Sequence, residues 1–253
     1  MPRANRHYLP GYVWHLTHRC HEREFLLKFG RDRRAWIDWL YEARQRYGLC
    51  VLNYTATSNH SHLLAWDQGH GEIASSMQLI AGCTGQDYNR RKARRGAFWE
   101  DRYHATAVES GEPLARCLVY LDLNMVRAGV VSHPAQWAAG GYHEIQAAPR
   151  RYRIVDRAAL AELLGLESVS QLPQVHAEWV ETALHNREHR RQPRWTESLA
   201  VGSRACAERV SSEFGNRARY RQVGAVEEAF VLREPAASYG ACFAGENGRT
   251  RPE

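Results

Sequence analysis

Two histidines, His60 and His62, stand one residue apart in the half-apolar segment NYTATSNHSHLLAWDQ, residues 53–68. In a β-strand the side chains of residues i and i+2 point to the same face, so an extended segment would place the two imidazoles side by side. Neutral imidazole is a common ligand of divalent metal ions, but two imidazoles fill only part of a coordination shell. The pair therefore indicates either a metal site completed by other residues or two surface or structural histidines.

A later segment, GEPLARCLVYLDLNMV at residues 111–126, offers such partners because its apolar residues recur at helical spacing. The apolar stripe consists of Leu114, Cys117, Leu118, Leu121 and Met125. Tyr120 and Asn124 are four residues apart, so they project from the same side of this helix. On its own, a tyrosine at this position is explained by packing. Beside a metal site it becomes a candidate nucleophile.

Other histidines are weaker candidates for a metal site. His18, Cys20 and His21 crowd the end of a β-rich run and suggest zinc, but strand alternation places His21 opposite the other two. We therefore do not expect a metal site there. His104 precedes the predicted helix and is a candidate for a supporting contact near the His60–His62 pair.

Positive charge is concentrated in one short segment. The formal net charge is +6 and the isoelectric point is about 9.1. Five basic residues fall in six consecutive positions, namely Arg90, Arg91, Lys92, Arg94 and Arg95. The planar guanidinium group suits bidentate contacts with phosphate, so this cluster indicates a contact with a nucleic-acid backbone. A solvated helix end and a genomic preference for arginine are the alternatives.

The elements that must position these residues follow from hydrophobic periodicity. We expect strands at residues 12–20, 49–58, 60–68 and 98–110, and helices at residues 31–47, 72–92 and 111–126. The order is β-α-β-β-α-β followed by a helix, which is the ferredoxin-like arrangement of the α+β class. Such a domain has one antiparallel sheet with two helices on one face, which leaves the other face free for a site.

The remaining sequence predicts a second region. We expect a catalytic domain over residues 1–146 and a helical C-terminal extension over residues 147–253, with a loose tail from about residue 235. The predicted helices of the extension cover residues 158–166, 175–184 and 203–214. The composition is that of a globular protein, and six scattered cysteines favour reduced core thiols. Without an apolar run of membrane-spanning length or a secretion signal, we expect a cytoplasmic protein with no membrane partner.

Two motifs together carry a family resemblance. NHSHLL at residues 59–64, combined with YLDLNMVRAGVV at residues 120–131, resembles the single-tyrosine HUH transposases, specifically the REP-associated tyrosine transposases. Supporting segments occur in the same order, namely PGYVWHLTHR (10–19), YNRRKARRGAFWEDRYHA (88–105) and HPAQWAAGGYHE (133–144). The resemblance covers about residues 8–146, and WTESLAVGS at residues 195–203 is similar to part of the C-terminal extension of some members.

The resemblance implies a function for each candidate residue. His60, His62 and Asn124 would hold a divalent metal, Mg²⁺ or Mn²⁺, and Tyr120 would be the nucleophile. The implied reaction cleaves and rejoins single-stranded, hairpin-bearing DNA through a covalent 5′-phosphotyrosine, without ATP. The basic cluster and Arg127 would contact DNA. The active unit would be a monomer or a homodimer, with the tyrosine acting in its own subunit or in that of a partner.

The motif departs from the family pattern at two places. Ser61 replaces a bulky apolar residue between the histidines, and Thr57-Ser58 replaces a Met-Pro pair before them. These changes are compatible with an active enzyme and also with a domesticated protein that binds structured nucleic acid without cutting it. An unrelated metal hydrolase is disfavoured, because the sequence has no HExxH motif and no aspartate cluster near the pair.

Overall fold

The computed structural model describes residues 9–186, 190–218 and 220–233. The first part of the chain has the predicted order of elements, and the fold is of the α+β class with a mostly antiparallel sheet. These elements are β1 (Val13–Arg19), α1 (Gly30–Tyr47), β2 (Cys50–Ala56), β3 (His60–Trp66), α2 (Glu72–Arg91), β4 (His104–Val108) and α3 (Glu112–Asp122). Their strands lie in the order β2-β3-β1-β4, and all three pairings are antiparallel.

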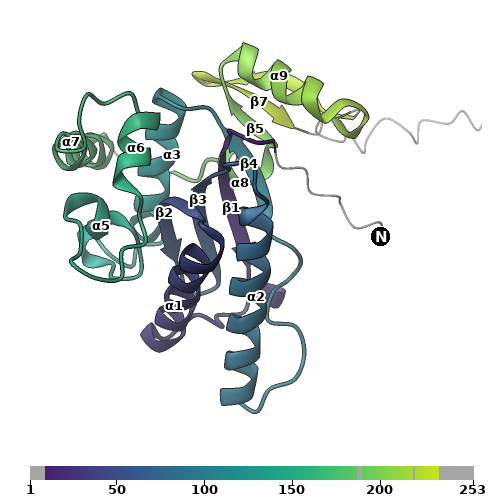
Figure 1. Ribbon diagram of the computed structural model, residues 1–253, viewed down its shortest axis with the longest axis vertical. Helices are drawn as coiled ribbons and strands as arrows, with labels where there is room; N and C mark the ends of the chain where they lie inside the picture. Colours follow the sequence, from purple (N-terminus) through teal and green to yellow (C-terminus); the bar gives the residue numbers. More distant parts are fainter. Residues whose placement is uncertain (1–8, 187–189, 219, 234–253) are drawn as a thin grey trace, which may run out of the picture.

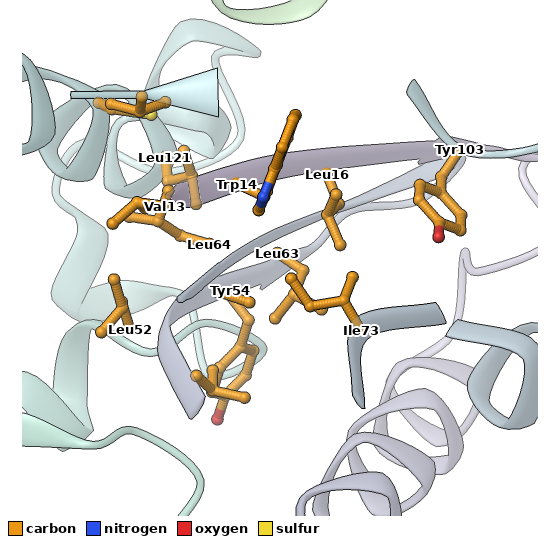
Figure 2. Packing of buried hydrophobic residues seen from close by; sticks show 14 of the residues in the cluster. Val13, Trp14, Leu16, Leu52, Tyr54, Leu63, Leu64, Ile73, Tyr103 and Leu121 are labelled. Carbon is orange, nitrogen blue, oxygen red and sulfur yellow. The ribbon is translucent and has the colours of Figure 1, made fainter. Parts of the chain in front are cut away.

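Helices α1 and α2 lie side by side over one face of this sheet (Figure 1). α1 buries Trp36, Leu40 and Ala43 and ends at Gly48, which adopts the left-handed conformation (φ 69°) that glycine accommodates without a steric penalty. Leu16 and Leu63 are register partners and lie on the α2 side with Ile73 (Figure 2). This face is therefore an ordinary apolar core.

The opposite face carries polar side chains. Alternation along β1 sends His15 and Thr17 to this face together with Val13, and their register partners on β3 are Leu64, His62 and Trp66. Helix α3 packs against the apolar end of the face, where Leu121 lies near Val13 and Leu64 (Figure 2). The imidazoles thus lie next to the helix that carries Tyr120.

The C-terminal extension contributes strands as well as helices. The predicted helices are present as α6 (Arg157–Leu163), α7 (Leu172–His185) and α9 (Arg204–Phe214). Three strands were not predicted, and they continue the sheet beyond β4 in the order β5 (Ala200–Gly202), β7 (Ala229–Arg233) and β6 (Gln222–Val226). β4 would otherwise be an exposed edge, and β5 pairs with it in parallel and satisfies its backbone groups.

Two predicted elements are shorter than expected. The strand predicted at residues 98–110 is limited to β4, because Trp99 forms only an isolated bridge with Cys20 and its indole donates to the Ala81 carbonyl at 3.0 Å. The helix predicted at residues 111–126 ends at Asp122, where Leu123 (φ −75°, ψ 4°) separates it from α4 (Asn124–Arg127).

The connector after α4 packs on the core. It contains the 3-10 helix η2 (Pro134–Gln136) and α5 (Tyr142–Gln146), and the Trp137 indole donates to the Ala56 carbonyl at 3.1 Å. A further short helix, α8 (Arg194–Glu197), precedes β5. The domain boundary at residue 146 stays a prediction, and the predicted loose tail lies outside the described residues. Within the described ranges, none of the helices has the length and hydrophobicity of a membrane span.

Candidate functional site

Three of the candidate residues meet on the polar face of the sheet. The Nε2 atom of His62 lies 2.9 Å from the amide nitrogen of Asn124, and both side chains are buried. The ring centroids of His62 and Tyr120 are 6.3 Å apart and nearly perpendicular. The break at Leu123 does not separate Tyr120 from Asn124, because Leu123 still donates its amide to the Val119 carbonyl and keeps the turn close to helical. All three groups belong to one chain.

His60 lies beside His62, with ring centroids 4.8 Å apart and an interplanar angle of 83°. Its Nδ1 lies 2.7 Å from Asn59 Oδ1 and 2.9 Å from Thr57 Oγ1. The Thr57 hydroxyl donates its proton to the His60 carbonyl at 2.8 Å, so its oxygen accepts from His60 Nδ1. The proton of the neutral imidazole is therefore on Nδ1, which leaves a lone pair on His60 Nε2.

Thr57 organises the tight turn between β2 and β3. Besides its two contacts with the His60 ring and carbonyl, its hydroxyl oxygen accepts from the amides of Asn59 and His60 at 3.3 and 3.1 Å. Thr57-Ser58 replaces the Met-Pro pair of the family pattern, so this turn has no proline. The structure gives this turn a different support, in which one hydroxyl fixes both the turn and the first histidine. Ser61 lies on the opposite sheet face and is buried.

A third histidine, His15, completes the polar cluster and was not singled out from the sequence. It is fully buried on β1, and its Nε2 lies 2.8 Å from His62 Nδ1. Its Nδ1 lies 2.8 Å from the backbone carbonyl of Trp195, in α8 of the extension. Alternation gave a signal for it, since His15, Thr17 and Arg19 are polar residues at every second position of β1 and so share one face.

Burial keeps these imidazoles neutral. Desolvation lowers the pKa of His15 to about 3 and that of His60 to about 4, and it holds the pKa of His62 well below its usual value. Neighbouring cationic groups, among them Arg127, add to this effect. The neutral imidazole is the form that binds a metal ion.

Tyr120 is buried between Arg127 and Trp195. The guanidinium carbon of Arg127 lies 3.9 Å from the centroid of the Tyr120 ring, and the same side chain donates to the Tyr120 carbonyl at 2.9 Å. The Trp195 ring lies on another side, at a centroid distance of 6.2 Å. Burial raises the pKa of the Tyr120 phenol, and the positive charge of Arg127 opposes that rise. The tyrosine thus has a cation in place for the phenolate.

Comparison with known proteins bears on this constellation. Residues 10–122 match the family of IS200-like transposases. The match covers less than half of the chain, and it makes the first part of the chain similar to IS200-like transposases. The match includes His15, His60, His62 and Tyr120, whereas Asn124 lies two residues beyond its end. It confirms the family resemblance of the two motifs.

No curated protein matches the chain. Among solved structures, the chain is similar to a REP-associated tyrosine transposase bound to a REP hairpin, with 15% sequence identity and a TM-score of 0.49. That similarity covers 62% of this chain and 94% of the other chain.

The basic cluster does not lie beside Tyr120. It lies at the end of α2, on the apolar side of the sheet (Figure 1). Three of its members have an acidic partner within the chain, since Arg91 pairs with Asp32, Arg94 lies 3.4 Å from Glu24, and Arg90 lies 3.7 Å from Asp87. Arg90, Lys92 and Arg95 are exposed. The structure therefore brings Arg127, but not the basic cluster, to the residues around Tyr120.

The alternative candidates have other environments. His18 Nε2 donates to the Asp101 carbonyl at 2.9 Å and its ring stacks on Trp99, while burial raises the pKa of the Cys20 thiol to about 12. His104 lies on the polar face, where its Nε2 contacts the Ser198 carbonyl at 2.9 Å. Within the described part of the chain, no three His, Cys, Asp or Glu side chains are grouped as a metal site.

The chemistry of the donor set fits a divalent metal that completes its shell with other ligands. His60 and His62 both use Nδ1 for hydrogen bonds inside the protein, so their Nε2 atoms are the ones that would bind a ligand. His62 Nε2 accepts from the Asn124 amide nitrogen at 2.9 Å, and a ligand would take the place of this hydrogen bond. The Asn124 amide contains both a donor and an acceptor, and a half-turn of the amide exchanges them. Two imidazoles and an amide oxygen leave positions open for water and phosphate oxygens.

Proposed function

We propose that this chain cleaves and rejoins single-stranded, hairpin-bearing DNA through a covalent bond between Tyr120 and a 5′ phosphate. The observation that carries the proposal is the position of Tyr120, whose ring centroid lies 6.3 Å from that of His62 in the same chain. A nucleophile beside a pair of neutral imidazoles supports metal-assisted phosphoryl transfer. The same distance supports a site in which the tyrosine acts in its own subunit.

His60, His62 and Asn124 are the residues that would hold Mg²⁺ or Mn²⁺. When bound, the metal offsets the negative charge of a non-bridging phosphate oxygen and orients the scissile bond. The residues around the site support metal binding in two ways. His62 is buried, which excludes water from around it, and the Thr57 hydroxyl holds the His60 ring in place. Phosphodiester oxygens repel an attacking nucleophile, so the reaction needs such a cationic environment.

The proposed reaction begins with Tyr120. Its hydroxyl oxygen bonds to phosphorus, the bond from phosphorus to the 3′ oxygen breaks, and that oxygen leaves as a free 3′-OH. The proton lost by the phenol equals the proton gained by the 3′ oxygen, so the step is neutral overall. Arg127 stabilises the phenolate character that develops on Tyr120, because its guanidinium lies over the ring. A second 3′-OH attacking the phosphotyrosine reverses the step and joins two strands.

The DNA strand needs a binding surface outside the chemical centre. We assign this to the exposed members of the basic cluster, Arg90, Lys92 and Arg95, which supply positive charge at the end of α2. Arg91 and Arg94 are partly neutralised by Asp32 and Glu24, so we expect them to contribute less.

The test uses single-stranded hairpin DNA carrying a 3′ fluorophore, incubated with the protein and Mn²⁺. We expect a labelled adduct that survives SDS, because a 5′-phosphotyrosine retains the 3′ part of the strand. The Tyr120→Phe variant should form no adduct, whereas Tyr47→Phe, on the exposed surface of α1, should react like the wild type. An adduct that persists in Tyr120→Phe would refute the assignment of the nucleophile.

The competing reading is a domesticated protein that grips structured DNA without cutting it. It predicts tight hairpin binding with no adduct under any metal or DNA sequence. The hydrogen bonds of Thr57 favour the enzyme, because they keep His60 oriented despite the departure from the family motif.

A further inference from the structure

A chain of hydrogen bonds links the C-terminal extension to His62. It runs from the Trp195 carbonyl to His15 Nδ1 at 2.8 Å, then from His15 Nε2 to His62 Nδ1 at 2.8 Å. The far nitrogen of His62, Nε2, faces Asn124 at 2.9 Å. His15 and His62 are both buried, so water does not compete for these contacts.

The direction of each hydrogen bond follows from the first acceptor. A backbone carbonyl can only accept, so His15 Nδ1 carries a proton. A neutral imidazole has one N–H, and therefore His15 Nε2 is an acceptor. Its partner, His62 Nδ1, must then carry the proton of the second ring. The lone pair of His62 Nε2 then faces the Asn124 amide nitrogen, from which it accepts a hydrogen bond at 2.9 Å.

The neutral state of His15 follows from its surroundings. The ring is fully buried, and burial disfavours the charged form of an imidazole. With two protons, His15 would be a donor at both nitrogens and would reverse the bond to His62. The buried site thus admits one arrangement of protons.

We propose that His15 is a positioning residue that fixes the ring tautomer of His62, so that the Nε2 lone pair of His62 is available to a divalent metal. The inference rests on the proposed metal site. It assigns a role to Trp195, which lies outside the residues that match the family and acts through its backbone carbonyl. The extension, by this account, is a part of the site.

The Trp195 carbonyl is held firmly enough to serve this purpose. The indole of the same residue donates to the Gln192 side chain at 2.7 Å, and Trp195 is buried. The following residues enter β5, where Leu199 accepts from the Ala107 amide at 2.8 Å. The tautomer of His62 is therefore tied to the docking of the extension on β4.

Thr17 is the competing partner of His62. Its hydroxyl oxygen lies 3.2 Å from His62 Nδ1, farther than His15 Nε2. A hydroxyl can either donate or accept, so Thr17 alone would permit both tautomers of His62. The bond to His15 removes this ambiguity, because His15 Nε2 can only accept.

The test reads the tautomer directly in the metal-free full-length protein. Nitrogen-15 correlation spectra distinguish protonated from bare ring nitrogens, and the His62 signals are assigned by their loss in His62→Gln. We expect Nδ1 of His62 to be protonated in the wild type. In His15→Phe we expect a mixture of tautomers, and in His15→Gln, whose amide oxygen can accept from His62, we expect Nδ1 protonation to be largely retained.

Mn²⁺ binding, followed by electron paramagnetic resonance, gives the second readout. His15→Phe should bind Mn²⁺ about 10- to 100-fold more weakly, with partial rescue in His15→Gln. The matched control is His104→Phe, which removes a similar bond to the extension but does not contact His62. It should leave both readouts unchanged.

Two results overturn the inference, namely protonation of His62 on Nε2 in the wild type, or an unchanged tautomer in His15→Phe. A wild-type protein with the expected tautomer that does not bind Mn²⁺ would instead contradict the proposed metal site.

Discussion

The guanidinium of Arg127 lies over the ring of Tyr120, with 3.9 Å between the guanidinium carbon and the ring centroid. Burial raises the pKa of the Tyr120 phenol. The positive charge of Arg127 lowers this pKa more than any other neighbouring group does. The pairing therefore joins the proposed nucleophile to a residue beyond the end of the family match.

Replacement of Arg127 by Gln should slow the formation of the covalent adduct by about tenfold, which corresponds to about 1.4 kcal/mol. Without the cation the pKa of Tyr120 rises further, so the rise of the rate with pH should move to higher pH. Arg127→Lys should recover part of the rate. The control is Arg116→Gln, since Arg116 lies on α3 together with Tyr120 but pairs with Glu112. An unchanged pH profile in Arg127→Gln would exclude this role.

Removal of the Thr57 hydroxyl should disturb the first histidine. Thr57→Val keeps the shape of the side chain but removes the contacts to His60 and to the Asn59 amide. We expect a loss of about 1–2 kcal/mol in the free energy of unfolding, together with weaker Mn²⁺ binding. Thr57→Ser should restore both. Thr55→Val, which removes a bond to the Leu121 carbonyl, should reduce stability but affect Mn²⁺ binding less.

A buried hydrogen bond joins the extension to α3. His176 Nε2 lies 2.7 Å from Asp122 Oδ2, and Asn53 donates to the other carboxylate oxygen at 3.0 Å. His176→Leu leaves the buried carboxylate without this hydrogen-bond donor, so we expect the free energy of unfolding in urea to fall by about 3 kcal/mol. The exposed pair of His133 and Glu181 is the control, and His133→Leu should cost less than about 1 kcal/mol. Equal losses would contradict the structural role of the buried pair.

Stability should depend on pH through His15. The folded-state pKa is about 3 and the ordinary value is 6.5, so between these values the unfolded chain binds a proton that the folded chain does not. His15 therefore does not change the folding stability above pH 6.5, and stability is lost as the pH falls below this value. In metal-free protein, His15→Gln should lose about 1.4 kcal/mol less than the wild type between pH 7.5 and 5.5. Parallel urea titrations of the two proteins would contradict this prediction.

The basic cluster should govern the salt dependence of DNA binding. A triple replacement of Arg90, Lys92 and Arg95 by alanine should reduce the slope of log K against log salt by about 2, at about 0.7 for each lost phosphate contact with single-stranded DNA. The control removes the same charge from the three exposed arginines within residues 150–153. If both triple variants change the slope equally, net charge and not this cluster determines binding.

Much of the fold was predictable because the signals were local. The helix α1 was indicated by the helical spacing of Trp36, Leu40 and Ala43 and by the glycine after Tyr47. The strands β1 to β3 were indicated by short runs of residues that favour strands. The strands of the extension were missed because β5 has three residues, too few to show a period. Its pairing with β4 depends on a neighbour almost a hundred residues away in the sequence.

The site was predictable to the extent that its residues form motifs. His60 and His62 share a face because of strand alternation, and Tyr120 and Asn124 share a side because of helical spacing. His15 could not be assigned in this way, because its function depends on the register of β1 with β3 and on a backbone carbonyl of the extension. A carbonyl has no sequence signature, so only the folded structure identifies it.

The central claim is that Tyr120 becomes covalently attached to a 5′ phosphate. The most direct measurement is mass spectrometry of the tryptic peptide of residues 117–127, isolated after reaction with hairpin-bearing single-stranded DNA and Mn²⁺, and trimmed by nuclease. We expect a nucleotide 5′ phosphate linked to Tyr120 in this peptide. A nucleotide linked to any other residue, or cleaved DNA with an unmodified peptide, would contradict it.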